Sequence, residues 1–82
     1  MPRYFFDVRE GSRFMPDEDG LELADLDHAE REATLAAAEI GRDRLPRTDA
    51  RDIGIEVRDE HGRIAVAVTV SMRVQRMEPA GA

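Results

Sequence analysis

The chain has 82 residues, a formal net charge of −6 and no cysteine. This length suits one small domain, and the lack of cysteine excludes disulfides and thiolate metal sites. No apolar run approaches the roughly 20 residues that span a bilayer, and the N-terminus has no signal-peptide core. These features predict a cytoplasmic domain at 1–76 with no membrane partner, followed by a disordered tail at 77–82.

The first part of the chain predicts short antiparallel strands. Tyr4, Phe6 and Val8 alternate with outward positions, which is typical of a strand with one buried face. The following residues contain two turn signals rich in glycine and acidic residues. The predicted elements are a strand at 4–9, a turn at 10–12, a returning strand at 13–15, a second turn at 16–20 and an extended arm at 21–23.

A single amphipathic helix is predicted from Leu26 to about Leu45. Asp25 is expected to cap its N-terminus, because a carboxylate accepts the free N–H groups of the first turn. Pro46 ends the helix, since the residue before a proline avoids the α region. Leu35 lies in the polar face. The apolar face comprises Leu26, Ala29, Ala33, Ala36, Ala37 and Ile40.

The last part of the chain predicts a second hairpin. Residues 53–57 alternate apolar and polar side chains, and Asp59–Gly62 suits a type I turn. The strand that follows keeps its alternation from Ile64 to Val74, the strongest pattern in the sequence. A turn centred on Glu60 and His61 pairs Val57 with Ile64, Ile55 with Val66 and Ile53 with Val68.

Together these elements predict an α+β fold, a two-layer sandwich of order β-β-(β)-α-β-β. One helix covers one face of an antiparallel sheet of hairpins and leaves the other face open.

The long last strand supplies the candidate interface. Its partner ends at about Asp52, so Val70, Met72 and Val74 are expected to pair with the N-terminal strand or with another subunit. The other side of the strand is small and uncharged, and with Phe5 it forms either a dimerisation face or a solvated sheet face. The candidate residues are Phe5, Leu35, Ala65, Ala67, Thr69, Ser71, Val70, Met72 and Val74.

The acidic excess lies between residues 17 and 32, where eight acidic residues face one arginine. Asp17, Glu18, Asp19 and Glu22 form a candidate surface for a basic protein partner. Acidic residues also suit turns and helix N-termini, which explains the same pattern without a partner.

No catalytic, metal or cofactor motif is found. His28 and Glu32, one helical turn apart, are more typical of a surface ion pair than of a metal site. Residues 17–20 resemble part of a calcium loop but lack the later ligands. Nucleic acid is not an expected partner, because the chain is acidic and its arginines are dispersed.

One set of residues, spread over nearly the full length, forms a family-like pattern: Arg3–Val8, Asp17–Leu23, Asp25, Leu26, Ala29, Glu32, Ala33, Ile55–Glu60, Gly62 and Arg63. On these residues the chain resembles a family of small uncharacterised proteobacterial proteins, which implies this fold but no activity. More weakly, the order of strands, a D-E-D-G-like turn and a helix is similar to that of HicB-like antitoxins. That similarity implies a small basic RNA-cleaving toxin as partner.

These observations favour a non-enzymatic interaction domain that forms a homodimer. The alternative is an antitoxin-like protein that masks a basic toxin, and an enzyme of unrecognised type is the third hypothesis.

Overall fold

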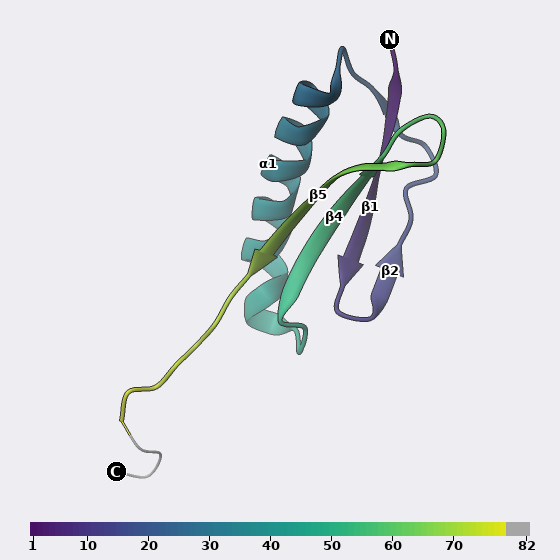
Figure 1. Cartoon of the computed structure of the whole chain (residues 1–82). Coiled ribbons are helices and arrows are strands. Elements are labelled where there is room, and N and C mark those ends of the chain that lie inside the picture. The colour runs from purple at the N-terminus through teal and green to yellow at the C-terminus, as the bar shows by residue number, and fades with distance from the viewer. Residues whose placement is uncertain (79–82) are drawn as a thin grey trace.

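The computed structural model describes residues 1–78 and shows one helix packed on an antiparallel five-stranded sheet (Figure 1). The α+β prediction is therefore confirmed. Residues 79–82 of the predicted tail lie outside the described residues. The elements are β1 (Arg3–Glu10), β2 (Arg13–Met15), β3 (Leu21–Glu22), α1 (Leu26–Arg44), a 3-10 turn η1 (Leu45–Arg47), β4 (Asp52–Arg58) and β5 (Ile64–Ser71).

The sheet has the order β2-β1-β4-β5, and β3 also pairs with β1. β1 and β4 are therefore central, whereas β5 forms one edge of the sheet. The prediction allowed the N-terminal strand to pair with the last strand, and this is wrong. β1 pairs with β4 along six residues instead, which leaves the outer edge of β5 without a strand in the described chain.

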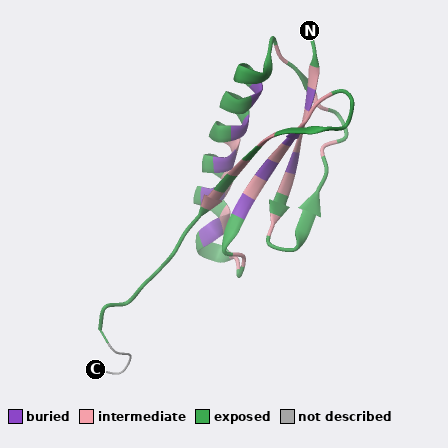
Figure 2. Cartoon of the chain, in the orientation of Figure 1, coloured by how far each residue is buried: buried purple, intermediate pink, exposed green. Residues whose placement is uncertain are grey.

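The core lies between α1 and the central strands (Figure 2). The helix contributes a stripe of small buried residues, and β4 contributes Ile53, Ile55 and Val57, which are fully buried. Small side chains allow the helix axis to approach the sheet closely. Gly41 shows such a close approach, because a Cβ added there would lie 2.9 Å from Val70 Cγ1. The helical stripe consists of Ala29, Ala33, Ala37 and Gly41.

Both predicted ends of the helix are found. Asp25 Oδ1 accepts a hydrogen bond from His28 N at 2.9 Å, which satisfies one free donor of the first turn. At the other end the chain tightens into η1, which contains Pro46.

The predicted register of the second hairpin is wrong by two residues. The structure pairs Val57 with Val66, Ile55 with Val68 and Ile53 with Val70. Two residues in the second half of the hairpin have no partner of their own on the opposite strand. Each such insertion shifts the pairing by one residue.

The first insertion is Gly62, the last residue of the predicted turn, which has φ of +80°. Gly62 N donates to Asp59 O at 3.1 Å, and Asp59 N donates to Arg63 O at 2.8 Å. A type I turn followed by a left-handed glycine is a common hairpin loop with one extra residue. The second insertion is Ala65, at a bulge beyond the Arg58–Ile64 pair. One insertion alone would turn the apolar side chains to the wrong face, but two restore it.

In the observed register the last strand no longer extends past its hairpin partner, because Ser71 pairs with Asp52. Val70 pairs with Ile53 and packs on the helix side, and the strand ends at Ser71 rather than Val74. Met72 and Val74 follow the strand, where the chain leaves the body of the domain (Figure 1). Ile64, expected opposite Val57, pairs instead with Arg58 at the bulge and is 58% exposed.

Candidate functional site

The two edges of the sheet are built differently. The outer edge of β1 is covered along its length by chain segments that follow it. β2 pairs with Val8–Glu10, and β3 pairs with Arg3 and Tyr4. Between them the carboxylate of Asp17 accepts a hydrogen bond from Phe6 N at 3.1 Å. This side chain fills the gap between two short strands, so this edge has little capacity for another strand.

Asp17 also organises the turn that carries it. Its Oδ1 accepts hydrogen bonds from Asp19 N at 3.1 Å and Gly20 N at 3.2 Å. Burial alone would raise the pKa of Asp17, but the N–H groups of Phe6, Gly20 and Asp19 lower it below its ordinary value. Gly20 has φ of +72°, and an added Cβ would lie 2.9 Å from Arg3 Cγ and from Phe5 Cε1. The turn therefore packs tightly against β1.

A buried ion pair holds the same turn to the open face of the sheet. Asp7 is 2% exposed, and its carboxylate accepts hydrogen bonds from Arg58 at 2.6 Å and 3.1 Å. Asp7 Oδ1 also accepts from Asp17 N, and Arg58 Nη2 donates to Asp17 O. Burial would raise the pKa of Asp7, but the Arg58 guanidinium and the Asp17 N–H lower it overall. The guanidinium lies 4.8 Å from the centroid of the Phe5 ring, so Phe5 is half-buried beneath a charge.

The Asp7–Arg58 pair was missed by the sequence reasoning. The two residues are 51 positions apart in the sequence. An acidic residue at an outward strand position is also typical of a solvent-exposed surface, so the sequence pattern does not indicate an ion pair. Their antiparallel strands bring them together on the open face.

β5 contrasts with the covered edge. From Ile64 to Met72 the chain has no charged residue and no proline, the two commonest devices that block an edge strand. A bulge at Ala65 interrupts only the start of the strand. Val66, Val68 and Val70 are only half-buried on the helix side, because no neighbouring strand covers them within the described residues.

Seven of the nine predicted interface residues form three exposed groups, whereas the other two, Phe5 and Val70, are half-buried. The four small residues of β5 are all exposed on the open face. Met72 and Val74, just beyond the strand, are 44% and 81% exposed. Leu35 is 61% exposed, but at about 100° per residue it lies nearly opposite the buried helical stripe. The small residues are Ala65, Ala67, Thr69 and Ser71.

The rest of the open face is charged, so the small and uncharged surface expected for the last strand does not extend across the sheet. Arg9 Nη2 lies 3.4 Å from Glu56 Oε1, and its guanidinium lies 4.6 Å from the centroid of the Phe14 ring. Gly54 leaves a shallow depression of about 130 Å³ between Arg9 and Thr69. The small-residue surface is therefore a strip along β5 alone.

The acidic surface is smaller in the fold than in the sequence. The carboxylate of Asp17 is occupied by backbone N–H groups, and Glu22 lies 3.4 Å from Arg3. Glu18 and Asp19 are exposed in the turn. Asp25 accepts from the His28 ring and backbone, and these contacts lower its pKa.

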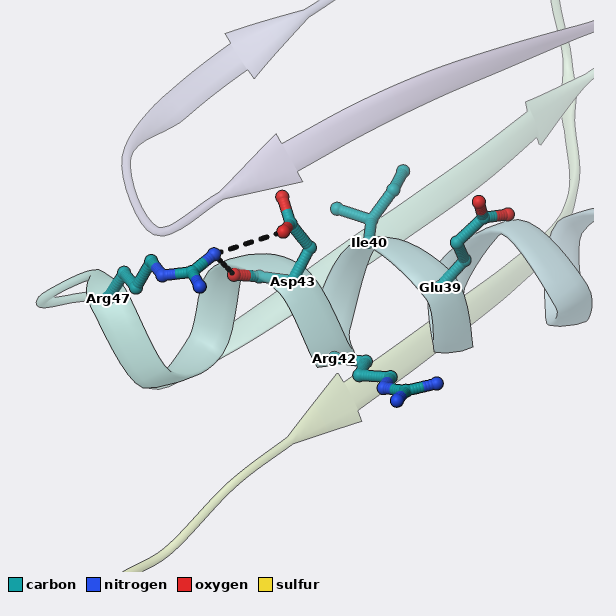
Figure 3. Close-up of a pocket in the computed structure, with 5 residues that line it drawn as sticks. All are labelled: Glu39, Ile40, Arg42, Asp43 and Arg47. Atoms are coloured by element: carbon teal, nitrogen blue, oxygen red, sulfur yellow. Dashed lines mark hydrogen bonds and ion pairs between the residues drawn. The ribbon is translucent and has the colours of Figure 1, made fainter.

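A shallow depression lies at the C-terminal end of the helix (Figure 3). Arg47 Nη1 pairs with Asp43 Oδ1 at 3.1 Å, and both side chains are exposed. Arg42 points away from this pair, so the polar groups around the depression do not converge on one point (Figure 3). Within residues 1–78 no three His, Cys, Asp or Glu side chains are grouped so that they could hold a metal ion. Within residues 1–78 no helix is both long enough and apolar enough to span a membrane.

Comparison with known proteins finds one family. A family model described as "Domain of unknown function (DUF6894)" matches residues 3–71, from the first residue of β1 to the last residue of β5. No curated protein and no solved structure matches the chain. The expectation of an uncharacterised family is thereby supported, whereas the similarity to HicB-like antitoxins is not confirmed.

Proposed function

The chain belongs to the family described as a domain of unknown function (DUF6894), and because that description assigns no activity, we propose a function from the geometry. The protein is a non-enzymatic interaction domain that assembles through the outer edge of β5, and it forms a homo-oligomer.

The difference between the two sheet edges carries this proposal. The β1 edge is occupied by β2, β3 and the Asp17 side chain. The β5 edge presents backbone N–H and C=O groups along an uncharged strand. Strand addition at an open edge gives affinity through main-chain hydrogen bonds and specificity through alternate side chains.

Side-chain burial supports the same edge. An added strand would cover the half-buried Val66, Val68 and Val70 on the helix side. Burial of apolar surface contributes roughly 25 cal/mol per Å². Further burial of the three valines would therefore favour association, in addition to the hydrogen bonds between the paired strands.

The non-enzymatic part of the proposal is supported by the shape of the surface. Active sites usually combine a deep pocket with converging polar groups. The depressions found among residues 1–78 are shallow and open, and the buried carboxylate of Asp7 is already paired with Arg58.

The proposal is tested by light scattering behind a sizing column, over a range from low to high micromolar concentration. We expect a mass above the 9.2 kDa of one chain. Val68→Lys places a charge on the helix side of the edge strand, where it reaches water in a monomer but is buried in a paired sheet. This variant is expected to be monomeric, with circular dichroism as the check on its fold.

Leu35→Lys is the matched control, because it adds the same charge at an exposed apolar residue of the helix. It should leave the mass unchanged. A wild-type protein that remains monomeric throughout contradicts the proposal, and so does an oligomer broken by Leu35→Lys but not by Val68→Lys. If Val68→Lys fails to fold, Thr69→Glu at the exposed side of the same strand replaces it, and we expect it to shift the protein towards monomer at the low end of the concentration range.

A further inference from the structure

We infer that the strand added at this edge is β5 of a second copy of the chain, antiparallel to the first around a twofold axis at Thr69. This inference rests on the proposed function and names its partner. The partner follows from the length, faces and charge of β5.

The regular part of the strand has its midpoint at Thr69. The bulge at Ala65 ends regular geometry on one side. On the other side the apolar alternation continues through Met72, one residue past the end of β5. Thr69 is the centre of the segment 66–72, so antiparallel pairing around it uses the whole segment in both copies.

This pairing preserves both faces of the sheet. On the helix side Val66 lies opposite the partner's Met72, and Val68 lies opposite the partner's Val70. On the open side Ala67 lies opposite the partner's Ser71, and the two copies of Thr69 face each other. Cross-strand pairs of β-branched side chains and threonine pairs stabilise antiparallel sheets by about 0.2–1 kcal/mol each. Met72, 44% exposed in the single chain, gains a neighbour in this arrangement.

Charge distinguishes a second copy from an unrelated strand. In a symmetric pair a charged residue near the axis meets its own copy, and like charges directly opposite each other are destabilising. The segment from Ile64 to Met72 contains no charge that could oppose itself.

The length of the regular segment selects the register. With the axis at Thr69, every residue from Val66 to Met72 lies opposite a residue of the same segment. An axis at Val68 or at Val70 would leave two residues of the segment opposite chain outside it. The axis at Thr69 therefore gives the longest regular ladder and keeps Met72 in it.

The inference is tested by disulfide cross-linking, for which the cysteine-free chain is well suited. Single variants Thr69→Cys, Ala67→Cys and Ser71→Cys are oxidised under mild conditions and followed by non-reducing electrophoresis. Residues facing each other at the axis have Cβ atoms about 5 Å apart. Residues 67 and 71 lie two positions from the axis, so each is about 14 Å or more from its own copy. Disulfides need Cα atoms within about 7 Å.

We expect Thr69→Cys to form covalent dimer at least tenfold faster than the other two variants. Because all three positions are exposed on the same face, they share the same background of random collisions. Faster cross-linking at residue 67 or 71 overturns the register. Equal slow rates at all three, with a dimer present by light scattering, overturn β5 pairing while the homo-oligomer stands. A monomer throughout overturns both.

Charge exchange gives a second readout. Thr69→Glu and Thr69→Arg each place like charges at the axis, so each alone should dissociate more readily than wild type, by roughly fivefold to tenfold. An equimolar mixture should recover a heterodimer at least as tight as the wild-type dimer. Failure of the mixture to associate better than either variant contradicts the twofold axis at Thr69.

Discussion

The Arg58 guanidinium holds the Asp7 carboxylate with two hydrogen bonds, from Nε to Oδ2 at 2.6 Å and from Nη2 to Oδ1 at 3.1 Å. The pair joins neighbouring central strands on the face that the helix leaves open. Through the contacts with Asp17 it also fixes the turn that covers the β1 edge. The strands on this side, β2 and β3, are only three and two residues long, so β5, with eight residues, is the longest uncovered edge strand of the sheet in the described chain.

Asp7→Asn is expected to destabilise the protein. The substitution removes a buried negative charge and leaves the Arg58 guanidinium without its ionic partner. Breaking buried pairs costs about 3–5 kcal/mol, and because the Arg58 side chain is 30% exposed we expect about 2 kcal/mol. Urea unfolding measures the change. The control is Glu56→Gln, which breaks the exposed Arg9 pair and should change the midpoint little. Equal effects of the two substitutions would contradict the special role of Asp7.

Acid is expected to destabilise the fold through the same network. Asp7 and Asp17 both have a pKa below the ordinary value of 3.8. The unfolded chain therefore binds protons more readily, and the free energy of unfolding falls as the pH drops. The contribution is complete above about pH 5 and is lost as the pH falls through the folded-state pKa values, below about pH 4.

Urea unfolding at several pH values between about 7 and 3 tests this expectation, and Asp7→Asn should show a shallower loss between the same limits. Stability that is constant or higher at the acidic end would exclude the proposed linkage.

The sequence predicts much of this fold because its patterns depend on neighbouring residues. The Asp25 cap, the alanine-rich helical face and the strand alternation are all local signals, and each is found in the structure. The hairpin register is not local in this sense. It depends on Gly62 and Ala65, whose extra positions are set by the hydrogen bonds around Asp59 and by a bulge.

The same difference between local and non-local features explains why the candidate site was predicted only in part. Strand alternation placed Ala67 and Thr69 on the open face, where the structure has them. Which strand lies at the edge depends on sheet order, which alternation does not encode. The Asp7–Arg58 pair depends on the pairing of β1 with β4, so it too lay beyond single-sequence reasoning.

Gly20→Ala is expected to loosen the turn that covers the β1 edge. An alanine at φ of +72° is strained, and its Cβ would lie 2.9 Å from Arg3 and Phe5 side-chain atoms. Left-handed strain costs about 1–2 kcal/mol, and overpacking adds about 1 kcal/mol or more. Gly62→Ala isolates the strain, because Gly62 has φ of +80° with no atom within 4 Å of an added Cβ. Thermal unfolding should therefore show a larger loss for Gly20→Ala, and a loss no larger than that of Gly62→Ala would refute close packing at Gly20.

Gly41→Ala tests the close approach of the helix to the edge strand. Alanine favours helix over glycine by about 1 kcal/mol, so the substitution stabilises an unpacked helix. Its Cβ would lie 2.9 Å from Val70 Cγ1 and 3.4 Å from Leu45 Cδ1, and overpacking of this kind costs about 1–3 kcal/mol. We expect net destabilisation in urea unfolding, because the helix must move away from β5. Val70→Ala removes the clashing methyl groups, so the double variant should be more stable than the Val70→Ala variant alone. An additive double variant would show that Gly41 and Val70 do not contact each other.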